Sequence, residues 1–176
     1  MKAAIGSYVI FLDSDDYWQD LYFLTAIAEV VTTKPEVMIV NFGWTKYFAS
    51  TNQFVKDQRV FSVPHIADRS KYITSLLQKD LYVASAWNKC VKRVFLVENN
   101  LFFRKGLRSE DMAWCGDLLY LMPEMACLHN YSYIYRQERL NSITATVDHK
   151  HLYDIIKMIK VALQNSEKLP PNEKLI

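Results

Sequence analysis

The chain has 176 residues and a mass of 20.6 kDa, which is the size of one ordinary domain with a hydrophobic core. Hydrophobic residues make up 51% of the chain and only four residues are glycine, which excludes a disordered or low-complexity protein. A net charge of +2 is too balanced for a protein that binds nucleic acid through phosphate neutralisation. We therefore expect one domain over residues 1–169 and a polar tail over residues 170–176.

Cysteine usage and the N-terminus indicate a cytoplasmic protein. The three cysteines form no C-x-x-C pair and have no histidine at metal-ligand spacing, so they predict neither a disulfide framework nor a zinc site. Lys2 and the apolar residues 3–12 resemble the start of a signal peptide, but carboxylates follow from Asp13 where small residues are needed. No run of 18 apolar residues predicts a membrane span.

The first third of the chain predicts a strand followed by a helix. The continuous apolar run of residues 8–12 predicts a buried, parallel strand at the centre of a sheet. Helical spacing over residues 21–31 predicts a covering helix, which Asp20 caps and Pro35 ends. The apolar face of this helix is expected to consist of Leu21, Leu24, Ile27, Ala28 and Val31.

The middle of the chain predicts further strands and two helices. Residues 37–42 predict a second strand, and residues 44–48 and 54–63 predict short strands or hairpin arms around a polar stretch. Helical spacing returns over residues 66–77 and 92–98. No internal repeat or linker divides this region from the rest of the chain.

The last third predicts a helix, two strands and a closing helix. A helix begins after Ser109 and ends before Pro123, and residues 125–128 and 131–135 predict two short strands. The closing helix presents an apolar face formed by Leu152, Ile155, Ile156, Ile159 and Leu163. Three lysines of this helix could contact anionic lipid headgroups, but a solvated face is the simpler explanation for them: Lys150, Lys157 and Lys160.

The first group of residues suited to chemistry is the run from Asp13 through Ser14 and Asp15 to Asp16. It follows the first strand, where open α/β sheets place a ligand crevice. In an extended segment Asp13 and Asp15 point the same way, and two carboxylates suit a Mg²⁺ or Mn²⁺ ion held together with a substrate diphosphate. A turn and helix cap built from Asp and Ser is the structural alternative.

Two other kinds of carboxylate site also begin with an acidic run of this type. An EF-hand calcium loop needs glycine at its sixth position and glutamate at its twelfth, where this chain has Trp18 and Leu24, so that site is excluded. A phosphatase of the haloacid-dehalogenase type also begins with a strand and D-x-D, but a small pair of residues follows in that family. Tyr17 and Trp18 follow here, so the metal-dependent phosphatase remains a minor alternative.

Two further groups of residues can serve a reaction. Glu110 and Asp111 lie in the first turn of a helix, where the helix dipole stabilises them and where a partly buried carboxylate can act as a general base. Trp87, Asn88 and Lys89 place an aromatic ring beside a cation, which can stack on a sugar or offset phosphate charge. Ordinary packing of a tryptophan between amphipathic cations explains this second group as well.

The order and spacing of four segments resemble the bacterial family 2 glycosyltransferases, which have the GT-A fold. The segments are GSYVIFLDSDDYW from Gly6, SAWNKCVKR from Ser85, LFFRKGLRSEDMAW from Leu101 and YIYRQERLNSIT from Tyr133. The resemblance spans nearly the whole chain. It implies an α/β fold whose mixed, Rossmann-like sheet is flanked by helices.

The resemblance also implies a role for each candidate residue. Asp111 would be the catalytic base, with Glu110 beside it, in an inverting transfer to a saccharide or lipid-linked acceptor during surface polysaccharide synthesis. The nucleotide-sugar donor would be bound by Asp13, Asp15, Asp16 and Arg108, with Mg²⁺ or Mn²⁺ on Asp15 and Asp13. The acceptor would lie near Trp87, Asn88 and Lys89.

The chain departs from this family at its start. Family members carry a further N-terminal segment with much of the nucleoside pocket, whereas only residues 2–6 precede the first strand here. We therefore expect the C-terminal portion of such an enzyme, with a catalytically inactive relic as the alternative. A sheet edge without its usual neighbour favours association, so we also expect a homo-oligomer.

Overall fold

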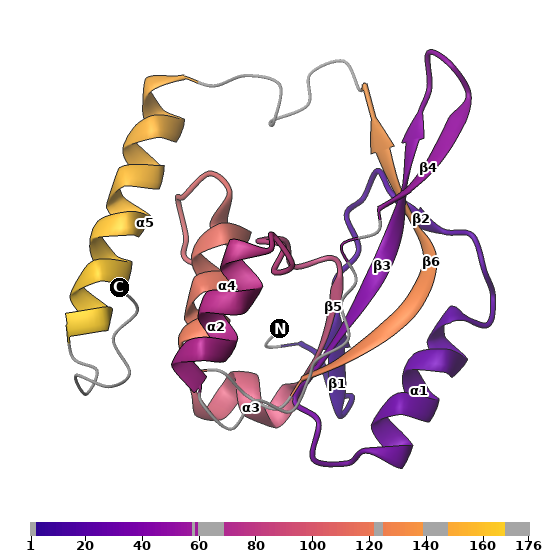
Figure 1. The fold of residues 1–176 in the computed structure, drawn as a ribbon, viewed down its shortest axis with the longest axis horizontal. Coiled ribbons are helices and arrows are strands. Elements are labelled where there is room, and N and C mark those ends of the chain that lie inside the picture. The colour runs from indigo at the N-terminus through magenta and orange to yellow at the C-terminus, as the bar shows by residue number, and fades with distance from the viewer. Residues whose placement is uncertain (1–2, 58, 60–68, 122–124, 139–147, 168–176) are drawn as a thin grey trace.

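A mixed sheet with helices on both faces organises the chain (Figure 1). The structure is a computed structural model that describes residues 3–57, 59, 69–121, 125–138 and 148–167. Its strands are β1 Tyr8–Ile10, β2 Tyr17–Trp18, β3 Ile39–Phe48, β4 Gln53–Asp57, β5 Lys89–Lys92 and β6 Met125–Gln137. Its helices are α1 Phe23–Thr33, α2 Arg69–Gln78, α3 Arg93–Glu98, α4 Glu110–Leu121 and α5 His149–Glu167. The α/β class and the mixed sheet flanked by helices are thereby confirmed.

Strand β3 is the centre of the sheet, whose order is β1-β5-β3-β6-β2. It pairs in parallel with β6 along one side, and antiparallel with β5 and then β4 along the other. Its first seven residues are all buried, because Val40 and Phe42 face one core while Ile39 faces the other. A strand with apolar side chains on both faces needs such cover on both sides.

Each face of the sheet carries its own hydrophobic core. One core packs α1 on the sheet through Phe23 and Ile27, with Phe42 and Tyr133 beneath them. The other core packs α2, α3 and α4 on the opposite face, with Trp114 among its largest side chains. Figure 1 shows α1 on one side of the strands and α2, α3 and α4 on the other. Strands β1 and β6 therefore contribute side chains to both cores, whereas α4 packs in one of them.

The prediction of a central, parallel first strand is wrong. Within the described residues β1 pairs only with β5, and the pairing is antiparallel. Residues 8–12 are apolar enough for a central strand, but Leu12 is half exposed and only Val9 is buried within β1. The remaining side of β1 pairs with no strand that the structure describes. Association through that edge stays a prediction.

Several predicted strands and helices differ in extent from those observed. The apolar runs 37–42 and 44–48 form one strand, β3, which makes a hairpin with β4. Residues 125–128 pair with β3 before a register shift and residues 133–137 pair with it afterwards, so the two expected strands are halves of β6. Residues 60–63 and 66–68, Pro123 and the tail over 170–176 lie outside the described residues.

Helix α1 begins two residues later than predicted, and its packing face contains only Ile27 and Val31 of the predicted residues. Phe23 and Ile27 are buried, whereas Leu21 and Leu24 are exposed. Asp20 is not the N-cap, because Tyr22 occupies that position. The Asp20 carboxylate instead accepts a hydrogen bond from the Tyr22 N–H (2.8 Å). The predicted stop is confirmed, because the helix ends at Thr33, shortly before Pro35.

Helix α5 also packs through a face that the apolar periodicity does not predict. Its buried positions are His151, Asp154 and Met158, whereas Leu152, Ile156, Ile159 and Leu163 are each about half exposed. The Asp154 carboxylate accepts hydrogen bonds from the Arg108 N–H (3.0 Å) and from Lys150 Nζ (2.7 Å). These contacts attach α5 to the loop before α4, so charged hydrogen bonds replace the expected apolar contact.

We expect the attachment of α5 to depend on Asp154 and not on Ile156. Asp154→Ala removes the acceptor of two hydrogen bonds, so the amides of α5 should exchange with deuterium about tenfold faster than in the wild type. Ile156→Gln alters a half-exposed side chain on the outer face and serves as the matched control. Hydrogen–deuterium exchange with mass spectrometry measures both variants. Faster exchange in Ile156→Gln alone would contradict the observed packing.

Candidate active site

The acidic run forms a turn that brings three carboxylates together. The Asp16 N–H donates a hydrogen bond to the Asp13 carbonyl (3.1 Å), which closes a turn over residues 13–16. One carboxylate oxygen each of Asp13, Asp15 and Asp16 lies within 4.8 Å of the others. The predicted convergence of Asp13 and Asp15 is confirmed. Its cause is this turn, and not the alternation of an extended strand.

Strand β6 holds the acidic turn in place through Asp16. The Tyr133 hydroxyl donates a hydrogen bond to Asp16 Oδ2 (2.7 Å), and the Arg136 N–H donates one to Oδ1 (2.9 Å). The Asp13 N–H in turn donates a longer hydrogen bond to the Tyr133 hydroxyl oxygen (3.4 Å). Asp16 is buried, and both of its oxygens are engaged. It therefore anchors the turn, and its predicted contact with a donor stays a prediction.

A stack of aromatic rings supports the Tyr133 anchor. Trp87 stacks on Tyr133 with 4.7 Å between ring centroids and 14° between ring planes, and its other neighbours are Tyr135 and Trp44. Tyr133 has no exposed surface. The sequence interpretation quoted Tyr133 only within a family segment and missed its role. A tyrosine among apolar residues of a buried strand is the signal that could have indicated a polar partner.

The acidic turn and the start of α4 share one electrostatic environment. Partial desolvation, together with repulsion from Asp16, Asp15, Asp111 and Glu110, raises the pKa of Asp13 to about 6. The Asp111 carboxylate is thus close enough to affect the turn, although 98 positions of the numbering separate Asp13 from Asp111. The structure brings together the two acidic groups that the sequence singles out separately.

The environment of Asp111 suits a group that accepts a proton. Burial raises the pKa of Asp111 and repulsion from Glu110 adds to it, whereas a hydrogen bond from the Met112 N–H (2.9 Å) and the charge of Lys89 lower it. Glu110 is exposed and Asp111 is half-buried at the N-terminus of α4. A carboxylate with a raised pKa is a better general base near neutral pH than a fully solvated one.

The buried side chain of Lys89 serves the fold. Its Nζ donates hydrogen bonds to the carbonyls of Val83 (2.7 Å) and Ser85 (2.8 Å) and to Asn88 Oδ1 (2.8 Å). It also lies 4.8 Å from the centroid of the Tyr82 ring. All three donors of the ammonium group are used, and burial lowers its pKa. Lys89 therefore fixes the loop before β5.

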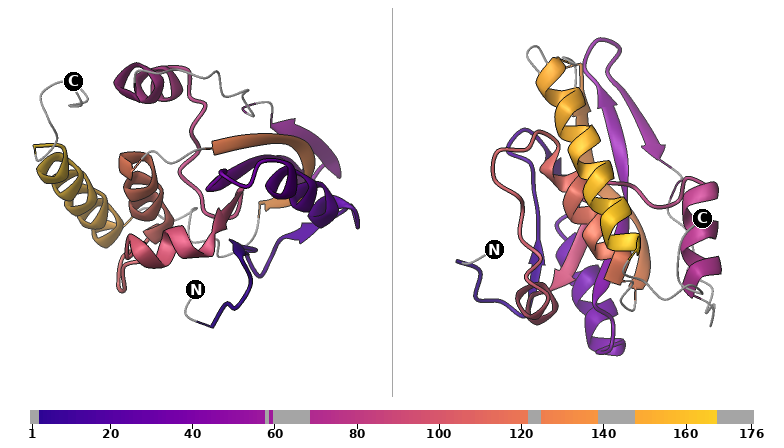
Figure 2. Two further views of the ribbon diagram at one scale, coloured as in Figure 1. Left: turned by 90° about the horizontal axis from the view of Figure 1, so that it is seen from below. Right: turned by 90° about the vertical axis from the view of Figure 1, so that its left-hand side faces the viewer.

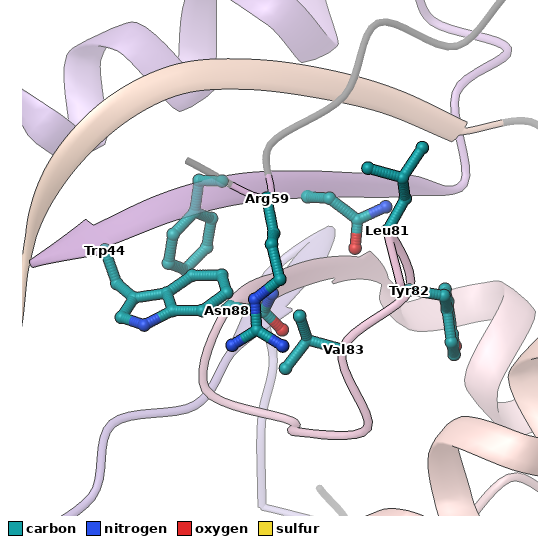
Figure 3. A pocket seen from close by; sticks show the side chains of 8 residues that line it. Trp44, Arg59, Leu81, Tyr82, Val83 and Asn88 are labelled. Atoms are coloured by element: carbon teal, nitrogen blue, oxygen red, sulfur yellow. The ribbon is translucent and has the colours of Figure 1, made fainter. Parts of the chain in front are cut away.

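Asn88 lines a pocket that is too small for a sugar. The pocket in Figure 3 has a volume of about 10 Å³, which is room for one water molecule. The Arg59 guanidinium lies over the Trp44 ring beside it, 5.3 Å from the centroid, and forms an ion pair with Asp57. Trp87, Asn88 and Lys89 are all buried. Their predicted role in acceptor binding stays a prediction, and the structure gives each of them a packing role.

Arg108 is engaged with α5. Its guanidinium donates a hydrogen bond to Asp148 (2.7 Å), and its N–H donates to Asp154. The predicted binding of a nucleotide-sugar by Arg108 would require its guanidinium to contact the nucleotide-sugar while it is paired with Asp148. This role stays a prediction. The observed contacts make Arg108 part of the attachment between the α4 loop and α5.

The acidic turn fits a hard divalent cation. Carboxylate oxygens are the ligands that Mg²⁺ and Mn²⁺ prefer in proteins, and the clustered oxygens of this turn supply them. The repulsion that raises the pKa of Asp13 is also the interaction that a bound cation would relieve. Asp13 and Asp15 are the residues that would hold it, because Asp16 is bound to β6.

Comparison with known proteins relates the chain to glycosyltransferases. It is 28% identical over 151 residues to the "Uncharacterized glycosyltransferase EpsJ" of Bacillus subtilis (strain 168), covering 82% of this chain and 41% of that protein. The crystal structure of S. aureus TarS 1-349 in complex with UDP-GlcNAc matches with a TM-score of 0.73 at 15% identity. That match covers 98% of this chain and 46% of TarS 1-349.

Other comparisons extend this result. A second structure of TarS 1-349 matches with a TM-score of 0.69 at 18% identity, over 98% of this chain and 44% of that one. No protein-family profile matches the chain. The chain thus has the fold of TarS and spans less than half the length of these relatives. No helix within the described residues is both long and apolar enough to cross a bilayer.

The raised pKa of Asp13 predicts a pH-dependent stability difference. Its native pKa of about 6 lies above the value of about 3.9 for an unfolded chain, so Asp13 lowers stability increasingly as pH rises from about 4 through 6. Without added metal, Asp13→Asn should melt at a higher temperature than the wild type at pH 7.5 and at nearly the same temperature at pH 3.5, which lies below both pKa values. Differential scanning calorimetry at both pH values measures this. A wild type that is the more stable protein at pH 7.5 would contradict the assignment.

The Tyr133 anchor predicts the effect of removing a single hydroxyl. Tyr133→Phe keeps the aromatic stack but removes a buried hydrogen bond to a carboxylate, which should lower the free energy of unfolding by about 1.5–3 kcal/mol. Tyr47→Phe, whose hydroxyl makes an exposed hydrogen bond to Asn52, is the control and should cost less than about 0.5 kcal/mol. Urea denaturation measures both, and equal losses would refute the anchoring role.

Proposed function

We propose that this chain carries the metal-binding and base-bearing part of a glycosyltransferase that uses a nucleotide-sugar donor. The single observation that supports this most is the clustering of the Asp13 and Asp15 carboxylates in one turn, whose charge Asp111 at the start of α4 affects. The fold of TarS, whose crystal structure contains UDP-GlcNAc, and the sequence similarity to EpsJ support the same class. The family 2 resemblance, the inverting course and a role in surface polysaccharide synthesis are parts of this proposal.

The proposed chemistry is a single displacement at the anomeric carbon. Asp111 accepts the proton of an acceptor hydroxyl while that oxygen attacks the sugar, and the bond from the sugar to the nucleoside diphosphate breaks. Mg²⁺ or Mn²⁺, held by Asp13 and Asp15, would offset negative charge on the departing diphosphate. Tyr133 keeps the acidic turn in place through Asp16. Because attack and departure occur on opposite faces, the anomeric configuration inverts.

Binding of uridine diphosphate with Mn²⁺ tests this proposal. Isothermal titration calorimetry of the wild type should give saturable heat that requires the metal, and Asp15→Ala should abolish it. Asp20→Ala is the matched control, because Asp20 lies outside the turn and bonds only the Tyr22 N–H nearby. No heat in the wild type would favour the inactive relic over the enzyme.

Asp111→Asn separates catalysis from binding. It should retain metal-dependent binding of uridine diphosphate and lower the release of this product from UDP-GlcNAc with saccharide acceptors by about 100- to 10,000-fold. The phosphatase alternative predicts another result: hydrolysis of p-nitrophenyl phosphate that needs Asp13 and is unchanged in Asp111→Asn.

A further inference from the structure

The outer face of α5 carries an apolar stripe that is about half exposed among the described residues. Leu152, Ile156 and Ile159 lie on one side of the helix and are 49–53% exposed, and Tyr153 beside them is 67% exposed. The opposite side of α5 is attached through Asp154 and Met158. Figure 1 shows α5 at the outer margin of the fold, and in the right-hand view of Figure 2 it lies in front of the other helices.

The exposed charges around this stripe are all basic. Lys157 and Lys160 are exposed on α5, and Lys105 is exposed on the adjoining loop. Between residues 149 and 164 the single acidic residue is Asp154, which is buried and bonded to Lys150. Between residues 149 and 164, the described side chains of α5 thus offer an apolar strip and positive charge without an exposed carboxylate.

A pocket with a basic rim lies on the inner side of α5, the side that Met158 attaches to the fold. It has a volume of about 300 Å³ and lies where the loop before α4 meets α5. Its apolar lining comes from Leu107, Met158 and Val161, and its charged lining comes from Arg104, Lys105 and Lys157. Arg104 is held by Asp117, whereas Lys105 and Lys157 make no ion pair among the described residues. Lys105 and Lys157 thus place positive charge beside an apolar lining where the loop meets α5.

We propose that α5 lies on the surface of a membrane that contains anionic lipid. Leu152, Ile156 and Ile159 enter the boundary between headgroups and acyl chains, and the exposed lysines of α5, Lys157 and Lys160, contact lipid phosphates. The helix lies parallel to the membrane plane, since its inner face stays attached to the fold. A second copy of the chain is a poorer occupant, because pairing two such faces brings like charges together.

Flotation of the full chain with lipid vesicles tests this proposal. The wild type should float with vesicles of phosphatidylcholine and phosphatidylglycerol but not with phosphatidylcholine alone, and added salt should weaken binding. Lys157→Gln combined with Lys160→Gln should weaken partitioning about 25-fold, at about fivefold per lysine. Ile156→Gln combined with Ile159→Gln should abolish flotation while circular dichroism stays unchanged.

The control variant changes apolar surface elsewhere. Val94→Gln combined with Val97→Gln alters two half-exposed residues of α3 and should float like the wild type. Absence of wild-type flotation with anionic vesicles would overturn the proposal, as would equal flotation of the α5 variants. So would a wild-type dimer in light scattering that Ile156→Gln and Ile159→Gln convert to a monomer, because the occupant would then be a second copy.

Discussion

The hydrogen bond from Tyr133 to Asp16 is the interaction on which the candidate site depends. It joins a solvent-facing acidic turn to a strand that pairs along the centre of the sheet. Without this tether, the turn after β1 would be held mainly by the short pairing of β2 with β6. The tether is costly to break, since Asp16 is buried and its charge needs both of its hydrogen bonds. The aromatic stack with Trp87 fixes the position of the Tyr133 ring, and its hydroxyl in turn fixes Asp16.

A cluster of carboxylates fixed in this way cannot relax by moving apart. The tether keeps Asp16 in place, and the turn closed between Asp16 and Asp13 keeps the remaining carboxylates nearby. Partial desolvation and then repulsion within the turn therefore raise the pKa of Asp13 while the turn stays closed. The charge of Asp111 also contributes to the raised pKa of Asp13. The pKa of Asp111 is itself raised by burial, and the charge of Lys89 opposes that rise. Core residues and site residues are thus coupled through electrostatics.

The sequence predicts the alternation of elements and the acidic groups, but not how they are placed. Apolar runs locate β1 and β3 correctly, but the composition of both runs predicts a fully buried strand. Which of the two is central depends on long-range strand pairing, and the structure shows that it is β3. The segment Trp87 to Lys89 has the composition of a ligand surface. Its burial follows from contacts with Tyr133 and with the carbonyls of Val83 and Ser85, which no local pattern contains. The role of Tyr133 was not predictable from local sequence either, because its hydrogen-bond partner Asp16 lies 117 positions away.

Helix α5 shows where reasoning from periodicity fails. The apolar face of an isolated helix predicts the buried face when burial is driven by apolar contact alone. Here Asp154 is satisfied by Lys150 and by the Arg108 N–H, so a charged face can be buried without leaving its carboxylate unpaired. Met158 adds the apolar contact on that side. The stronger apolar stripe is left on the surface. Burial of these side chains in a membrane boundary would remove apolar area from water, which is favourable.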